Sequence, residues 1–115
     1  MRRWNTSGTP QSIGVAPVDE PSPLVELLPA RPNPLNPRTR IRLRLASSLA
    51  VDVRIHDLRG RLVKQLRPRS TMEPGTHELE WDGTDERGIA VASGSYLCVL
   101  RTEGRFQSRP LVVVR

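Results

Sequence analysis

The stretch TRIRLRLASSLAVDVRIHDLRGRLVKQL, residues 39–66, decides the fold, because its apolar and polar side chains alternate with the period of a β-strand. In residues 39–46, three aliphatic side chains share one face of the predicted strand and three arginines share the other. Residues 50–58 repeat this arrangement, and Gly60 suits a tight hairpin into residues 61–66. The predicted inward residues are Ile41, Leu43, Leu45, Val51, Val53 and Ile55, and the predicted outward residues are Arg40, Arg42, Arg44, Asp52, Arg54 and His56.

From residue 24 onward the rest of the chain also consists of short apolar runs bounded by turn residues. The other strand candidates are residues 25–30, 76–81, 91–103 and 106–115. His77, Leu79 and Trp81 share one face of their strand, and Gly94 interrupts another strand near its start. Seven short strands at roughly ten-residue spacing, with no helical periodicity, predict an all-β sandwich or barrel.

A change of composition divides the chain into two parts. Residues 1–23 are rich in Pro, Ser, Thr and Gly and lack periodicity, which predicts a flexible linker or tail before a single domain over residues 24–115. Two arginines near the N-terminus are not followed by an apolar segment, so we do not expect a signal peptide within this sequence. An exported form would then need a signal upstream. No apolar run approaches the roughly 20 residues of a membrane span.

The segment RPNPLNPRT, residues 31–39, places three prolines directly before the first long strand. Proline fixes φ and biases the residue before it toward extended geometry, so this segment cannot be a helix or a central strand. It is a rigid connection that lowers the entropy of the unfolded chain and aims the strand at its neighbour. Such a connection suits a module appended to another domain.

The formal net charge is +6, and arginine and lysine are concentrated in residues 38–69. This could indicate nucleic-acid binding, but no aromatic side chains are interleaved for base stacking, so we predict no nucleic-acid partner. The favoured interpretation is a solvated strand face whose arginines discourage edge-to-edge aggregation and pair across strands with Asp52. Contact with an anionic cell-surface polymer such as lipopolysaccharide remains an alternative.

No arrangement of residues typical of an enzyme is present, and we predict neither catalysis nor a cofactor. His56 and His77 lie on different predicted strands, and the G-x-S-x-G motif does not occur. Cys98 is the single cysteine, which excludes an internal disulfide, and its inward position mid-strand predicts a buried structural thiol.

The loop DGTDERG, residues 82–88, gathers Asp82, Asp85 and Glu86. A dedicated calcium loop needs alternating ligands and a bidentate glutamate at its twelfth position, and this loop has neither. Asx turns, in which the carboxylate accepts hydrogen bonds from nearby backbone N–H groups, explain the aspartates adequately. We therefore predict no metal site, although the carboxylates leave a bound cation open.

Five segments, in this order, resemble a known family: PNPLNPRT, VDVRIHDLRGRLVKQL, GTHELEWDGTDERG, VASGSYLCVL and PLVVVR. They look like the FlgD-type immunoglobulin-like domain and the related C-terminal sorting domain of proteins exported by the type IX secretion system. The resemblance covers residues 24–115 and implies an immunoglobulin-like antiparallel β-sandwich of about seven strands.

Several positions correspond to the family's motifs. Pro32, Asn33 and Pro34 match its PNP box, and Asp57, Leu58 and Gly60 match its hairpin, where His56 replaces the usual tyrosine. Trp81, Asp82 and Gly83 match the WDG turn, and Gly94 and Tyr96 match the SGxY box. Leu35 stands in place of the usual phenylalanine. We expect Trp81 to fill the core, and Tyr96 to place its ring in the core and bond its hydroxyl to nearby backbone, as in a tyrosine corner.

The resemblance implies a non-catalytic C-terminal module of an exported bacterial protein, carried through the periplasm to the cell surface or beyond. Its partner would be the secretion apparatus or a neighbouring domain, and strand addition to the last strand is one mechanism. The residues expected to be recognised are Pro32, Asn33, Pro34, Leu111, Val112, Val113, Val114 and Arg115. The alternatives are a structural spacer, as in flagellar hook-capping proteins, and an adhesion module, for which the sequence offers no aromatic platform.

Overall fold

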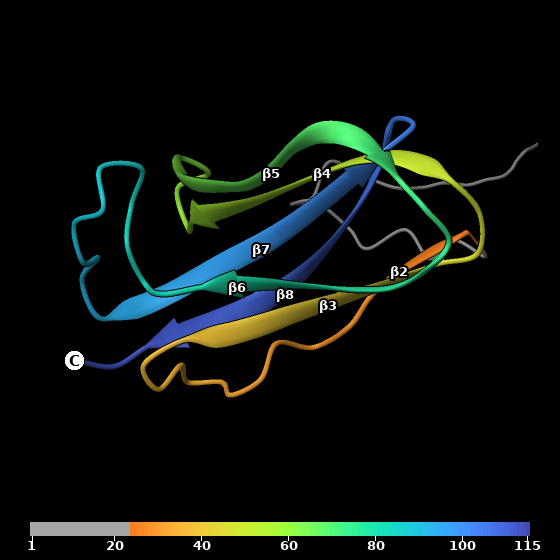
Figure 1. Ribbon diagram of the computed structural model, residues 1–115. Coiled ribbons are helices and arrows are strands. Elements are labelled where there is room, and N and C mark those ends of the chain that lie inside the picture. Colours follow the sequence, from red (N-terminus) through yellow and green to blue (C-terminus); the bar gives the residue numbers. More distant parts are fainter. Residues whose placement is uncertain (1–23) are drawn as a thin grey trace, which may run out of the picture.

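The computed structural model describes residues 24–115, and every regular element in this range is a β-strand (Figure 1). The strands are β2 (Val25–Leu27), β3 (Thr39–Leu45), β4 (Leu49–Asp57), β5 (Leu62–Met72), β6 (Gly75–Trp81), β7 (Gly94–Thr102) and β8 (Arg105–Val113). None of these described residues forms a helix that could cross a membrane. The tail predicted for residues 1–23 lies outside the described range.

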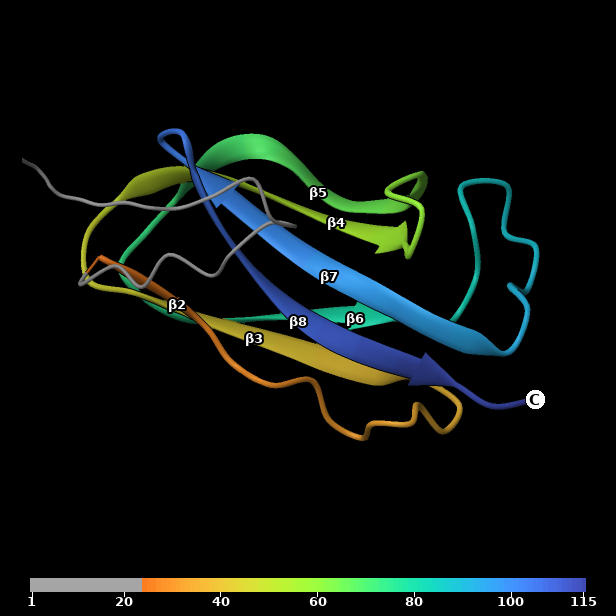
Figure 2. The ribbon, with the colours of Figure 1, turned by 180° about the vertical axis from the view of Figure 1, so that it is seen from behind.

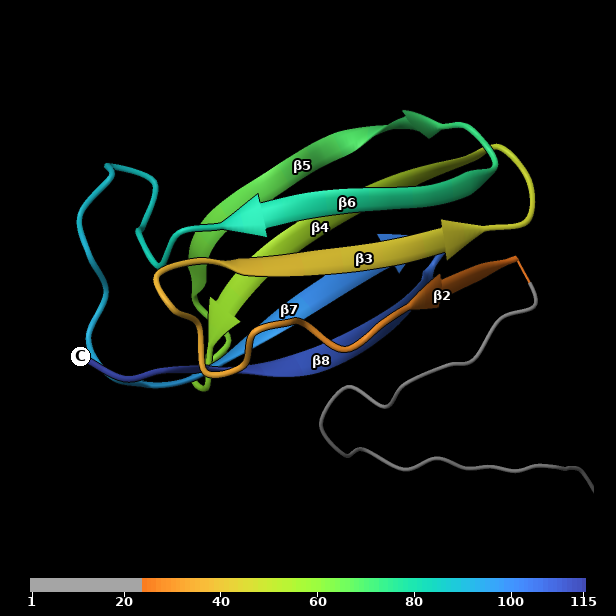
Figure 3. The same ribbon diagram turned by 60° about the horizontal axis from the view of Figure 1, so that its bottom comes forward.

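The seven strands form two antiparallel sheets, with the orders β2-β3-β6 and β5-β4-β7-β8. The three-stranded sheet lies in front of the four-stranded one in Figure 3. From behind, Figure 2 shows β8 beside β7 at the edge of its sheet. The predicted immunoglobulin-like β-sandwich is confirmed.

The core lies between the sheets and consists mainly of aliphatic side chains from alternate strand positions. All six residues predicted to face inward along β3 and β4 are buried. Trp81 is fully buried at the end of β6, and its ring meets the ring of Tyr96 edge-on, with 5.7 Å between the centroids. Cys98 is also fully buried, and this burial raises the pKa of its thiol to about 12. The predicted burial of this thiol is confirmed, and its raised pKa keeps it protonated at neutral pH.

Tyr96 forms the expected corner, because its hydroxyl donates a hydrogen bond to the carbonyl oxygen of Ala92 at 2.7 Å. Replacing Tyr96 by phenylalanine keeps the buried ring and removes only this bond. We expect the free energy of unfolding to fall by about 1 kcal/mol, the net value of one such hydrogen bond. Urea unfolding of the two proteins measures the difference, and an unchanged midpoint would show that the corner contributes nothing.

Asp52 lies on the outer face of β4, as predicted, but it is not solvated, since only 7% of this residue is exposed. β4 is an interior strand, and long side chains from both sides cover its outer face. Asp52 pairs with Arg101 in the β4–β7 register, and its Oδ1 lies 3.6 Å from Nε of Arg54. The arginines of β3 cannot pair with Asp52, because β3 belongs to the other sheet.

Ion pairs on the three-stranded sheet form instead with glutamates of its own strands, as between Arg44 and Glu26 and between Arg38 and Glu80. These pairs are exposed and each contributes well under about 1 kcal/mol.

The boundaries of several strands also differ from those predicted: β2 ends at Leu27 and β8 at Val113, and β5 and β7 differ as well. β5 extends well beyond Leu66 and passes through Pro68. The β4–β5 register shifts here. Val51 pairs with Ser70 and Val53 pairs with Arg67, so β5 has one more residue than β4 between these two pairs. A bulge on an edge strand is one of the few places in a sheet that tolerates proline. β7 begins at Gly94 and is not interrupted by it.

Candidate recognition surface

The proline segment, residues 31–38, packs along the free edge of β8. The side chain of Asn33 acts there as a strand partner would: its Nδ2 donates to the carbonyl oxygen of Pro110 at 3.0 Å, and its Oδ1 accepts from the N–H of Val112 at 2.9 Å. The N–H of Leu35 donates to the carbonyl oxygen of Val112 at 3.2 Å. The two predicted recognition segments, far apart in sequence, are thus neighbours.

This contact changes what a partner could bind on β8. The outward backbone groups of Pro110 and Val112, which strand addition would need, already have partners in the proline segment. Leu111 and Val113 are each only 1% exposed and belong to the core. Of the expected recognition residues on the last strand, Val114 and Arg115 are exposed to solvent, Val114 at 68%. Strand addition at residues 110–112 is therefore not available while the segment stays in place.

Two polar side chains that the sequence analysis did not single out connect β8 to β2 by further hydrogen bonds. Gln107 is 8% exposed, and its amide bonds the backbone of both Val25 and Leu27, each at 2.9 Å. Arg109 donates from Nε to the carbonyl oxygen of Leu27 at 2.9 Å. The sequence does contain a signal for the role of Gln107. The alternation of β8 places its side chain inward, and a buried side-chain amide needs hydrogen-bond partners, which here lie on the opposite sheet.

The last residue, Arg115, is anchored to the loop that follows β6. Its backbone N–H donates to Oγ of Ser93 at 2.8 Å, and its guanidinium donates to the carbonyl oxygens of Val91 and Gly83 at 2.9 and 2.7 Å. Gly83 adopts φ +78°, and a Cβ there would lie 2.9 Å from Nη2 of Arg115 and 3.3 Å from Cδ1 of Leu35. We call this junction of Asn33, Leu35, Gly83 and Arg115 the clasp.

The acidic loop supports this junction through the Asx turns that the sequence predicted. Oδ1 of Asp82 accepts from the N–H and hydroxyl of Thr84, and Oδ1 of Asp85 accepts from the N–H groups of Arg87 and Ile89. These hydrogen bonds lower the pKa of both carboxyl groups. The largest contribution comes from the Thr84 hydroxyl for Asp82 and from the N–H of Ile89 for Asp85.

Glu86 of the same loop accepts from the N–H of Gln65 on β5. Over residues 24–115, no three side chains of the types that bind metals lie close enough together to hold an ion. The carboxylates of Asp82, Asp85 and Glu86 all accept hydrogen bonds from backbone N–H groups.

At the β4–β5 hairpin, Gly60 adopts φ +84° and Asp57 closes the turn through hydrogen bonds from the N–H groups of Arg59 and Arg61. The bond from Arg61 is the main cause that lowers the pKa of the Asp57 carboxyl. His56, which replaces the usual tyrosine, bonds the carbonyl oxygen of Gly60 through Nδ1 at 3.1 Å. The family's hairpin motif therefore has a local structural role.

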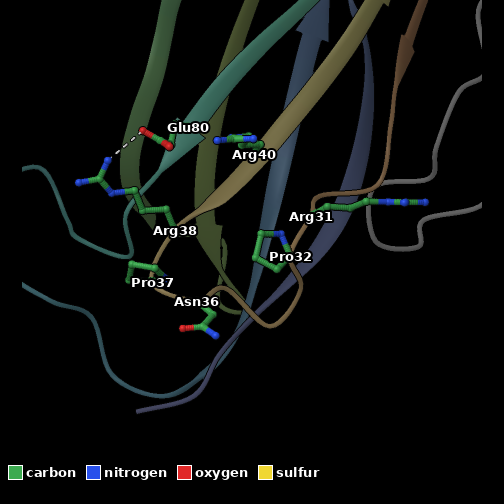
Figure 4. Close-up of a pocket in the computed structure, with 7 residues that line it drawn as sticks. All are labelled: Arg31, Pro32, Asn36, Pro37, Arg38, Arg40 and Glu80. Atoms are coloured by element: carbon green, nitrogen blue, oxygen red, sulfur yellow. Dashed lines mark hydrogen bonds and ion pairs between the residues drawn. The ribbon is translucent and has the colours of Figure 1, made fainter.

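An open hollow of about 490 Å³ lies between the proline segment and the outer face of β3 and β6 (Figure 4). Arg38 reaches across to Glu80, with 3.4 Å between Nη1 and Oε1. Arg31 and Arg40 are joined through two backbone hydrogen bonds, and neither guanidinium has an acidic partner among residues 24–115. The lining residues are Arg31, Pro32, Asn36, Pro37, Arg38, Arg40 and Glu80.

Comparison with known proteins identifies the architecture around this site. The FlgD Ig-like domain family matches residues 36–104. Among solved structures, dimeric latent PorU from Porphyromonas gingivalis aligns with a TM-score of 0.60 and 28% identity over 84% of this chain. PorZ of the same organism, an essential bacterial surface component of the type IX secretion system, aligns with a TM-score of 0.54 and 26% identity over 77% of this chain.

The chain covers only 10% of PorU and 11% of PorZ. FlgD from P. aeruginosa shares the fold, with a TM-score of 0.54 and 21% identity over 76% of this chain and 73% of its own. No curated protein matches the chain.

Proposed function

Because the chain belongs to the FlgD Ig-like domain family, we propose that it is a non-catalytic module of an exported bacterial protein and acts as a type IX secretion sorting or anchoring domain. The observation that carries the proposal is the similarity to PorZ, whose structure is that of an essential surface component of this secretion system. The similarity to PorU, a long chain of which this domain matches a tenth, supports a module with neighbouring domains. Its route leads through the periplasm to the cell surface.

The recognition surface in this proposal is the exposed side of the clasp together with the hollow beside it. Pro32 and Pro34 present rigid apolar surface, and Val114 adds an exposed aliphatic side chain. Arg31 and Arg40 supply positive charge and form no ion pair among residues 24–115, although Glu80, the partner of Arg38, lies opposite Arg40 in the β3–β6 register. A partner of the secretion apparatus would place an acidic side chain in the hollow and apolar side chains against the prolines.

An export assay tests this proposal. The 115-residue chain is fused behind a periplasm-directed fluorescent reporter in a host with a type IX system, and fluorescence is counted at the cell surface and in the medium. We expect the reporter to be exported, and the substitution Arg40→Glu to lower export about tenfold, because a reversed charge repels an acidic partner.

Arg42→Glu is the matched control, since Arg40 and Arg42 face Glu80 and Glu78 in the same β3–β6 register, and only Arg40 lines the hollow. Deleting residues 111–115 would be a poorer test, because it removes the buried Leu111 and Val113. A reporter that stays in the periplasm although circular dichroism shows a folded domain would overturn the sorting role.

The second candidate is a structural spacer, favoured by the shared fold of FlgD from P. aeruginosa. In that case the domain would separate its neighbours without being recognised by a secretion apparatus. The export assay distinguishes the two roles, because a spacer would leave the reporter in the periplasm with or without Arg40.

A further inference from the structure

A second hollow, of about 240 Å³, lies beside the β7–β8 turn. Figure 1 shows this turn at the opposite end of the sandwich from the C-terminus. All four strands of the four-stranded sheet contribute to it. Arg54 comes from β4, Arg69 from β5, and Arg101 from the end of β7, while the β7–β8 hairpin adds Arg105 and Phe106. The hollow is therefore built from segments up to half the chain apart and is preserved by the pairing of β4 with β5 and β7.

The charge of this hollow is strongly positive. Four arginines line it against one carboxylate, that of Asp52. Arg69, Arg101 and Arg105 have no acidic partner among residues 24–115. Like charges gathered around a concave surface repel one another, and an anion that enters relieves this repulsion. Guanidinium groups bind phosphate in a bidentate manner, which makes arginine the cation best suited to such an anion.

The floor of the hollow adds an acceptor that a simple phosphate site would not need. Asp52 is 7% exposed and accepts no hydrogen bond from residues 24–115: its Oδ1 is closed to solvent, 3.6 Å from Nε of Arg54, which leaves Oδ2 as the oxygen open to the hollow. This oxygen is without a donor unless a ligand or water in the hollow supplies one. A hydroxyl group is a donor of the right kind, and it carries no charge that the arginines would repel.

Phe106 supplies the remaining surface, because its half-buried ring lies on the wall of the same hollow. Aromatic rings pack against the apolar C–H face of a sugar. We propose that this hollow binds a phosphorylated sugar, with the phosphate held by the free arginines, a sugar hydroxyl donating to Asp52, and the sugar ring against Phe106. The proposal is independent of the sorting role and of the clasp.

Calorimetric titration of the 115-residue chain at low salt tests the assignment with three probes: glucose 6-phosphate, inorganic phosphate and glucose. We expect glucose 6-phosphate to bind about tenfold more tightly than inorganic phosphate, the equivalent of one additional hydrogen bond, and glucose not to bind. Equal affinities for the two anions would overturn the assignment of a sugar, and no heat with either anion would overturn the site.

The triple variant Arg69→Ser, Arg101→Ser and Arg105→Ser should weaken glucose 6-phosphate binding by about tenfold or more, since each of these arginines is exposed and not needed for the core. The matched control is Arg40→Ser, Arg42→Ser and Arg44→Ser, which removes the same net charge from the other sheet. Equal losses in both triple variants would show attraction by net charge alone and overturn the site. Asp52→Asn should selectively reduce the advantage of the sugar phosphate over phosphate.

Discussion

Replacing Trp81 by alanine is expected to lower the free energy of unfolding by about 4 kcal/mol, the largest loss at any single position of this domain. The side chain is fully buried, so its removal opens a cavity between the two sheets. It also removes the edge contact with Tyr96 and the hydrogen bond from Nε1 to the carbonyl oxygen of Thr84 at 2.9 Å. Chemical unfolding followed by circular dichroism measures the loss without depending on tryptophan fluorescence.

Trp81→Phe is the informative companion, because it keeps an aromatic ring against Tyr96 and leaves the Thr84 carbonyl without its donor. We expect it to cost clearly less than the alanine variant, about 1–2 kcal/mol. A loss below about 1 kcal/mol for Trp81→Ala would contradict the placement of the indole in the core.

The alternation of β3 and β4 made the inner face of the sandwich predictable from sequence. Ile41 and Val53 are buried because a strand places every second side chain on the same face, a property of the backbone alone. Asp52 shows where this reasoning fails. Its position on the outer face was inferred correctly from the period, but its burial depends on Arg54 and on the strands at either side, which no local pattern reports.

The clasp was predictable in its parts and not in its geometry. The family resemblance marked Asn33 and Gly83 as separate motifs. Asn33 meets Pro110 across a separation of 77 residues, and Gly83 meets Arg115 across 32 residues. Contacts between residues so far apart in the sequence depend on the topology. β8 is the edge strand of its sheet, and this edge runs beside the proline segment. The rigid prolines now have a further role, which is to hold Asn33 where its amide can cap that edge.

Replacing Gly83 by alanine is expected to lower the free energy of unfolding by about 3 kcal/mol. Part of this loss is conformational, because a left-handed φ of +78° costs a residue with a Cβ about 1–2 kcal/mol. The rest comes from the clasp. The new methyl group would press on the guanidinium of Arg115 and displace it from the carbonyl oxygens of Gly83 and Val91, each bond being worth about 1 kcal/mol.

Gly60→Ala separates these two contributions. Gly60 has nearly the same backbone conformation, with φ +84°, but a Cβ there would meet no atom within 4 Å, so its loss should be the conformational cost alone. The excess of Gly83→Ala over Gly60→Ala then measures the clasp, and most of it should vanish when both variants carry Arg115→Ala as well. If Gly83→Ala and Gly60→Ala cause equal losses while Arg115 is present, the contacts of Arg115 with the loop do not contribute to stability. A persistent excess without Arg115 would assign the contact to Leu35 instead.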